Sequence, residues 1–163
     1  MREKIFKLIF ITLGLLSTFN MQGKDKNEVL TYDISCAGSG NQGFYLVQIS
    51  AFVNKSSEIN NDIVCKCAVH GVLFKGFTGS QGCTTQKPLA GSALVEVQNA
   101  DFFASFFKSG GAYLSYSTII GGSFQSQHID KKYKVTAVVA VAKDQLRKDL
   151  EKAGIIKGLS SGF

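Results

Sequence analysis

The chain is poor in several of the residues that mark common protein classes. Its 163 residues include no tryptophan, one proline (Pro88), two histidines and four cysteines. A single proline excludes a proline-rich linker, and a composition that is 45% hydrophobic and 18% charged is that of a packed domain rather than a disordered segment. We also find no internal repeat. The sequence therefore predicts one folded domain with a single core.

Long hydrophobic runs are missing as well. An early run, Leu8 to Leu16, is much shorter than the roughly 20 apolar residues of a membrane-spanning helix. It follows a basic start and precedes a polar stretch, which is the order of a secretory signal peptide. We expect a signal peptide at residues 1–23, cleaved near Gly23, and a mature domain at 24–163 with no transmembrane segment. An uncleaved anchor at the membrane surface is the alternative.

Export would narrow the range of functions. Compartments outside the cytoplasm are poor in ATP and NAD and permit disulfides, so most cytosolic enzyme classes are disfavoured. The first cysteine, Cys36, lies too far from the apolar run for a lipoprotein leader. The net charge of +6 is modest, and the chain shows no basic face with aromatic platforms, so we expect no nucleic-acid binding.

Apolar residues alternate with polar ones in several segments, as on a strand with one buried face. In the first segment, Leu30, Tyr32, Ile34 and Cys36 share one side. The last segment loses its alternation toward Val141, which indicates cover on both faces. The predicted strands are residues 30–36, 45–53, 113–120 and 133–141.

Between the second and third of these strands, and again near the end of the chain, apolar residues recur at the spacing of a helix. We predict helices that begin at Ser56 or Ser57 and end at Phe74, that run from residue 99 or 101 to 110, and that span 144–153 with Gly154 as the C-cap. This order predicts an α+β fold: an antiparallel sheet of about four strands with two to three helices packed on one face, as a two-layer sandwich.

Four residues carry the ligand chemistry of a zinc site: Cys65, Cys67, His70 and Cys83, called here the Cys-His cluster. The spacing argues against zinc, because the first two lie two residues apart on a predicted helix and point to opposite sides. The Cys-x-x-Cys of a redox site is also missing. We expect no metal or cofactor, with Cys67 and Cys65 as buried apolar residues. Structural disulfides are the other interpretation: Cys83 can reach Cys36 or a helix cysteine, and three full pairings are open.

Catalytic groups are equally hard to find. A catalytic His70 would need a nucleophile and an orienting acid near it in space, which the sequence does not reveal, and a histidine on the apolar side of a helix is usually structural. A G-x-S-x-G elbow is absent, which disfavours a hydrolase. We therefore predict no catalytic residues and favour a protein that is not an enzyme.

Glycine-rich segments form motif-like patterns. Residues 38–43 match G-x-G-x-x-G, but a strand follows them where a dinucleotide site needs a helix, so we predict a connection between strands. The long stretch 75–94, the turn at 110–111 and the polar segment 121–128 are the loops where a binding surface would be expected. Solvated connectors are the alternative.

Four phenylalanines fall within six residues, namely Phe102, Phe103, Phe106 and Phe107. They cover more than one face of a helix, so one or two can be left for an interface. We predict a non-enzymatic binding, interaction or structural module whose partner is a protein, a surface polymer or a second copy. The alternative is a thiol- or zinc-dependent activity of the Cys-His cluster, which requires its atoms to converge.

Two segments carry a family resemblance. The stretch 66–77, Lys-Cys-Ala-Val-His-Gly-Val-Leu-Phe-Lys-Gly-Phe, and the predicted strand and helix at 135–155 resemble small exported proteins of Gram-negative bacteria. The resemblance implies a location in the periplasm or cell envelope. It implies no activity and transfers no functional residue, because the similar positions are of the core type.

Overall fold

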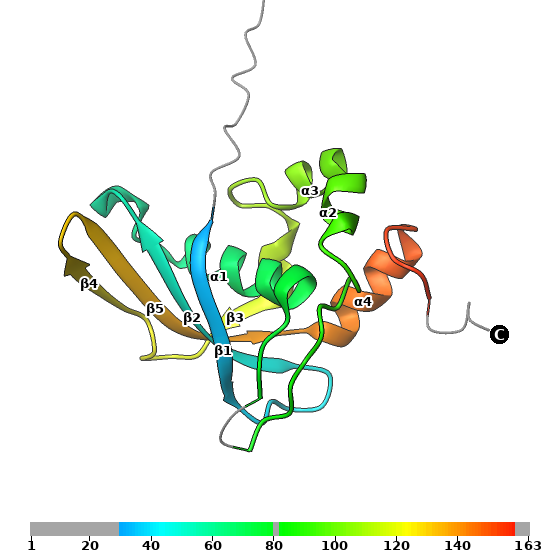
Figure 1. The fold of residues 1–163 in the computed structure, drawn as a ribbon, viewed down its shortest axis with the longest axis horizontal. Helices are drawn as coiled ribbons and strands as arrows, with labels where there is room; N and C mark the ends of the chain where they lie inside the picture. Colours follow the sequence, from blue (N-terminus) through cyan, green and yellow to red (C-terminus); the bar gives the residue numbers. More distant parts are fainter. Residues whose placement is uncertain (1–29, 80–81, 159–163) are drawn as a thin grey trace, which may run out of the picture.

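The computed structural model describes residues 30–79 and 82–158, and the predicted signal peptide lies outside them. In this part of the chain, an antiparallel sheet of five strands is combined with four α-helices, which confirms the predicted α+β class (Figure 1). The strands are β1 (Thr31–Gly38), β2 (Tyr45–Val53), β3 (Ser117–Ile119), β4 (Gln125–Ile129) and β5 (Lys132–Val141). The α-helices are α1 (Asn61–His70), α2 (Leu94–Gln98), α3 (Ala100–Phe106) and α4 (Lys143–Lys152).

Strands β2 and β5 form the centre of the sheet. The order is β1-β2-β5-β3, and β4 pairs with the first half of β5 while β3 pairs with its end. Val47 lies opposite Val139, and Ile49 opposite Ala137. These four side chains are fully buried, because the two-residue period of both strands directs them to the face that α1 covers. Full burial of one such valine or isoleucine contributes about 1.5–3 kcal/mol to folding.

Helix α1 begins later than predicted. Residues 56–58 form a separate 3-10 turn, η1 (Ser56–Glu58), and neither predicted serine caps α1. The cap is Asn60, whose side-chain oxygen accepts a hydrogen bond from the Ile63 amide at 3.0 Å. Asparagine caps as well as serine, so capping preference alone could not place the start. A π-helical turn, η2 (Gly71–Lys75), extends α1 to the predicted end.

The third predicted strand is mostly helical. Residues 112–116 form a 3-10 turn, η3 (Ala112–Tyr116), and only the short β3 follows it. The phenol ring of Tyr113 is fully buried, so tertiary packing and not alternation fixes this segment. Strand β4 was missed because all five of its residues are exposed and show no apolar side.

Helix α4 ends as predicted. Gly154 has φ 72°, a conformation that glycine adopts without strain, and its amide donates to the Glu151 carbonyl at 3.0 Å. Leu146 and Leu150 are buried on the inner face of the helix. This fixes α4 beside η3 and α3, where the candidate site lies.

Candidate functional site

The structure does not bring the Cys-His cluster together. Cys65, Cys67 and His70 lie on α1, whereas Cys83 forms a disulfide with Cys36 at the end of the sheet. Within residues 30–79 and 82–158, no group of three or more histidine, cysteine or acidic side chains could hold a metal ion. The convergence that a thiol- or zinc-dependent activity requires is therefore not found in the described chain.

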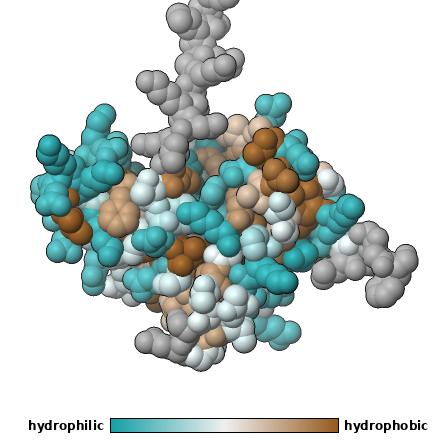
Figure 2. Space-filling view, viewed as in Figure 1, coloured by the Kyte–Doolittle hydropathy of each residue, from teal (hydrophilic) through white to brown (hydrophobic). Residues whose placement is uncertain are grey.

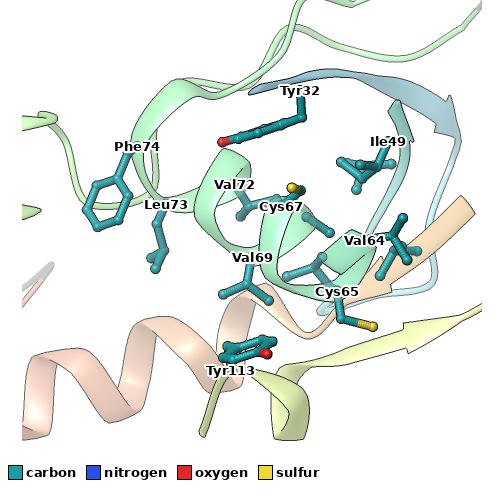
Figure 3. Close-up of a cluster of buried hydrophobic side chains, with 14 of the residues drawn as sticks. Tyr32, Ile49, Val64, Cys65, Cys67, Val69, Val72, Leu73, Phe74 and Tyr113 are labelled. Atoms are coloured by element: carbon teal, nitrogen blue, oxygen red, sulfur yellow. The ribbon is translucent and has the colours of Figure 1, made fainter. Parts of the chain in front are cut away.

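The two free thiols point into separate parts of the core. Figure 3 shows Cys67 beside Tyr32, while Cys65 is turned toward β3. Burial raises the pKa of Cys67 to about 12 and also raises the pKa of Cys65. Both are buried, as the sequence predicted, and both are protonated thiols at neutral pH.

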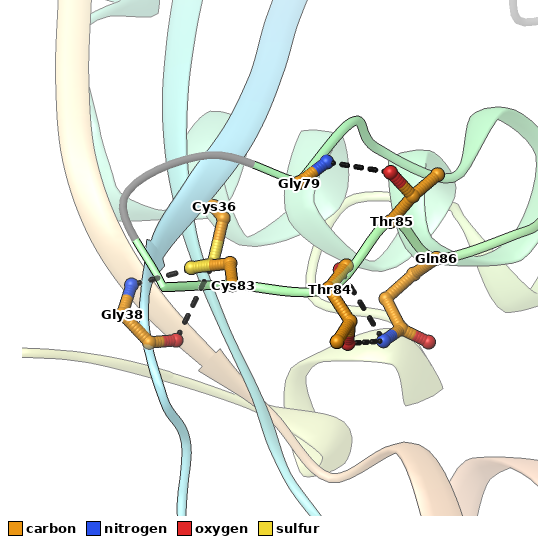
Figure 4. Close-up of a disulfide and its surroundings, with 7 residues drawn as sticks. All are labelled: Cys36, Gly38, Gly79, Cys83, Thr84, Thr85 and Gln86. Carbon is orange, nitrogen blue, oxygen red and sulfur yellow. Dashed lines mark hydrogen bonds between the residues drawn. A yellow bond between two sulfur atoms is a disulfide. The ribbon is translucent and has the colours of Figure 1, made fainter.

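The disulfide ties the glycine-rich stretch to the sheet (Figure 4). It joins Cys36 near the end of β1 to Cys83 across 47 residues of sequence. Close to it, Gln86 accepts a hydrogen bond from the Tyr45 hydroxyl of β2 at 2.6 Å. The segment around Cys83 is thus attached to two strands. Of the partners open to Cys83 the structure has Cys36, and none of the three full pairings forms, because Cys65 and Cys67 are free.

His70 has two polar partners that sequence distance concealed. The Tyr32 hydroxyl donates to Nδ1 at 2.6 Å, and Nε2–H donates to Oε1 of Glu96 at 3.2 Å. The rings of Phe74 and Phe107 pack against the imidazole. Burial lowers the pKa of His70, although the Glu96 carboxylate opposes this shift. A neutral His70 therefore joins β1, α1 and α2 in one network.

A tyrosine, a histidine and an acid joined by hydrogen bonds resemble a proton relay, but the tyrosine end of this network is buried, while the side chains of His70 and Glu96 are 18% and 36% exposed. Tyr32 is 5% exposed, and burial raises the pKa of its phenol. The Lys75 ammonium covers the Tyr32 ring at 3.6 Å from the ring centroid. Neither of the hollows described below is lined by a residue of the network. We therefore interpret His70 as structural, as the sequence indicated.

The four phenylalanines divide between core and surface. Phe103 and Phe106 are buried, whereas Phe102 and Phe107 are half-buried. Phe107 packs against the imidazole of His70 and the ring of Tyr113. Phe102 stacks on Phe106 with ring centroids 5.8 Å apart and lines a surface hollow. At least one of the four thus lines a hollow that is open to solvent.

A hollow of about 340 Å³ opens between α3, η3 and α4, and we call it the aromatic hollow. Its walls include the rings of Phe102, Phe106 and Tyr116 and the side chain of Leu150. The rings of Phe106 and Tyr116 stack with their centroids 5.9 Å apart. Ser105, Ala112, Ala153 and Asp149 complete the lining. Its size lies at the lower end of the range for small-ligand sites, enough for one side chain of a partner.

Asp149 is the charged member of this lining. The amide of Gln145 and the hydroxyl of Tyr116 both donate to its Oδ2, at 2.8 and 2.9 Å. These two bonds hold the pKa of Asp149 below its ordinary value, so the carboxylate is charged at neutral pH. No side-chain hydrogen bond within the described residues reaches Oδ1. The aromatic hollow therefore combines apolar walls with one available carboxylate oxygen.

Exposed apolar side chains occur on the neighbouring helix α2. Leu94 is 65% exposed and Val97 is 73% exposed, and their spacing of three residues places them on one face. The opposite side of α2 is anchored, because Glu96 binds His70 and Val95 packs against the core. Figure 2 shows hydrophobic surface gathered over α2 and α3.

The glycine-rich and polar segments that the sequence singled out have different structures. Residues 38–43 connect β1 to β2, as predicted. A second hollow, of about 290 Å³, lies beside the disulfide and is lined by this connection and by residues 82–86. Residues 125–129 of the expected polar loop form β4. The sequence singled out Phe102 and Phe106, but not Tyr116, Leu150 or Asp149, because these lie on segments distant in sequence.

No protein-family model, curated protein or solved structure matches the chain. The resemblance to exported proteins of Gram-negative bacteria therefore stays a prediction. None of the helices in residues 30–79 and 82–158 is long and apolar enough to cross a membrane.

Proposed function

We propose that the protein is a non-enzymatic interaction domain that binds a partner protein of the bacterial cell envelope through the aromatic hollow. The hollow itself is the observation that carries this proposal, because three aromatic rings and Leu150 surround a space open to solvent. Leu94 and Val97 add exposed apolar surface on α2, the helix that precedes α3. Aromatic anchors and partly exposed apolar side chains are typical of protein interfaces.

The disulfide supports a location outside the cytoplasm. Cys36 and Cys83 are joined although 47 residues separate them, and such bonds persist in oxidising compartments. The basic, apolar and polar order of residues 1–23 favours the same location. Together these features favour the periplasm or envelope of a Gram-negative bacterium.

The reactive side chains support binding over catalysis. The thiols of Cys65 and Cys67 are buried and protonated, and the phenol of Tyr32 is closed off by Lys75. The aromatic hollow, in contrast, is lined by a serine, a tyrosine and an aspartate without a histidine, cysteine or lysine. Its lining offers shape and one charge, which suit recognition.

In-cell photo-crosslinking tests this function. A photoreactive amino acid replaces Ser105, which lines the aromatic hollow, in cells that express the protein naturally. The matched control carries the same group at Gln48, which is exposed on the opposite face of the sheet. We expect a discrete protein adduct from position 105 and none from position 48. A second change, Leu94→Asp with Val97→Asp, should weaken the adduct if the partner also covers α2, because it places charge on the exposed apolar face of that helix.

Each other outcome counts against the proposal. An adduct of twice the mass of the chain would replace the partner protein with a second copy. A ladder of adducts would indicate a surface polymer. Equal adducts from both positions, or none from position 105, would remove the aromatic hollow as the binding site.

A further inference from the structure

The aromatic hollow restricts the chemistry of what can fill it. Phe102, Phe106, Tyr116 and Leu150 favour contact with apolar atoms, and the aromatic faces also attract a cation, but they offer few hydrogen-bonding groups to a neutral polar partner. The carboxylate of Asp149, at the rim of the hollow, instead requires a polar or charged partner. Asp149 is ionised, and an apolar group placed against it would remove water from the carboxylate without replacing its hydrogen bonds. A suitable occupant is therefore apolar along its length and cationic at its end.

The carboxylate geometry makes the requirement more specific. Tyr116 and Gln145 both bind Oδ2, which fixes the orientation of the carboxylate and leaves Oδ1 available. A single N–H donor suits one available oxygen. An arginine guanidinium binds best when its fork meets both oxygens of a carboxylate, and here one of them already has two donors.

We propose that the aromatic hollow binds a lysine side chain of the partner protein, with its methylene stem against the rings and its ammonium donating to Oδ1 of Asp149. Lysine has this divided chemistry, a four-carbon apolar stem that ends in a compact charge. The inference rests on the proposed function, because it names what the partner inserts. It excludes acidic side chains and predicts a penalty for purely apolar ones.

The protein carries two lysines of its own near this carboxylate. Lys148 and Lys152 are close enough to lower the pKa of Asp149, but they contribute less than the two hydrogen bonds. Neither lysine lines the hollow. From outside the hollow, these two ammonium groups compete with an incoming lysine for the Asp149 carboxylate. Replacing both lysines with glutamine should therefore strengthen the binding of the incoming lysine.

Titration with short peptides, followed by NMR of the purified protein, tests this inference. The probes are acetyl-Gly-Lys-Gly-amide, the same peptide with norleucine, which lacks the ammonium, and the same peptide with glutamate. We expect the lysine peptide to shift the signals of Ala112, Leu150 and Ala153. It should bind about threefold to tenfold more tightly than the norleucine peptide, as expected for one charge at a half-exposed rim. Added salt should reduce this preference.

Variants of α4 locate the preference. Asp149→Asn should bring the lysine and norleucine affinities close to equality, because it removes the charge and keeps the shape. Asp144→Asn is the matched control: it removes the same charge from the same helix at a position that does not line the hollow, so the preference should persist. The NMR spectrum of each free variant reports whether the fold is intact.

The outcomes separate the two proposals. If no peptide shifts the signals of the hollow, the hollow is not a binding site and both proposals fail. If the norleucine or glutamate peptide binds as well as the lysine peptide, the proposed function stands and the lysine assignment is overturned. A preference that survives in Asp149→Asn would also overturn it.

Discussion

The interior around α1 and the surface beside α4 differ both in the types of residue they contain and in how open they are to solvent. The interior contains the chemically reactive groups: Cys65, Cys67 and Tyr32 are buried, and the side chain of His70, bonded to Tyr32, is 18% exposed. The surface contains ordinary residues, yet it is hollowed and open. Reactive residue types therefore mark the core of this protein, and the site lies where packing leaves space.

The difference has a simple physical origin. A buried thiol or a hydrogen-bonded imidazole behaves as a core group, since its charged form is disfavoured by desolvation. An open hollow needs no reactive group, because contact area and one charge are sufficient for recognition. The predictions below test whether the interior is as closed, and the hollow as open, as this comparison requires.

The largest expected effect is on thiol alkylation. In a Ser105→Cys variant, iodoacetamide at pH 8 should modify the new thiol at least about a thousandfold faster than Cys67. A pKa of about 12 leaves far less thiolate than the ordinary value of about 8.5. Intact mass should show one adduct on the native variant and none on the native parent over the same time.

Denaturation supplies the control for this experiment. Without reductant, the unfolded parent chain should gain two adducts, at Cys65 and Cys67, because the Cys36–Cys83 disulfide protects the other two cysteines. Reduction should raise the number to four. Rapid modification of Cys67 in the native protein would show that the interior opens, and the comparison would fail.

The next effect is on stability and uses two leucines. Leu73→Ala should reduce the free energy of unfolding by about 2–5 kcal/mol, because it leaves a cavity at a fully buried position. Leu94→Ala should change it by no more than about 0.5 kcal/mol, since this side chain is 65% exposed. Urea unfolding of both variants measures the difference. Equal losses would mean that Leu94 is already covered, and α2 would not be a free surface.

Much of the fold could be predicted from the sequence where local patterns and packing agree. Strand β2 has its predicted bounds, because Val47 to Val53 alternate between a buried and an outer face. Gly154 ends α4 as expected. Prediction failed where a segment lacks a sided pattern, as in β4, or where one buried ring fixes an irregular turn, as with Tyr113.

The candidate site was predictable only in part. The phenylalanine cluster stood out because four large apolar residues exceed what one helix face can bury. The partners of Phe102 could not be found, since Tyr116 and Asp149 lie on other elements and meet it only in the folded chain. The same holds for Tyr32 and Glu96 around His70. Contacts between residues far apart in sequence leave no local pattern.

The smallest expected effect is a pH dependence that separates the two regions. His70 is neutral in the folded protein because burial and the charges of Lys75 and Lys66 lower its pKa, although Glu96 raises it. The unfolded chain binds a proton below about pH 6.5, so it holds more protons than the folded chain. Stability should therefore be complete above that pH and fall as the pH drops toward the folded pKa, by at most about 1.4 kcal/mol per pH unit.

Two variants assign this slope, measured by urea unfolding between about pH 7 and 5.5. Glu96→Gln should extend the loss to lower pH, because it removes the carboxylate that supports the imidazolium. His128→Gln, at an exposed position of β4, should leave the slope unchanged. Over the same range the preference of the aromatic hollow for lysine should stay constant, since the two hydrogen bonds hold the pKa of Asp149 below its ordinary value and keep the carboxylate ionised. A parallel loss of stability and preference would mean that the interior and the hollow respond as one unit.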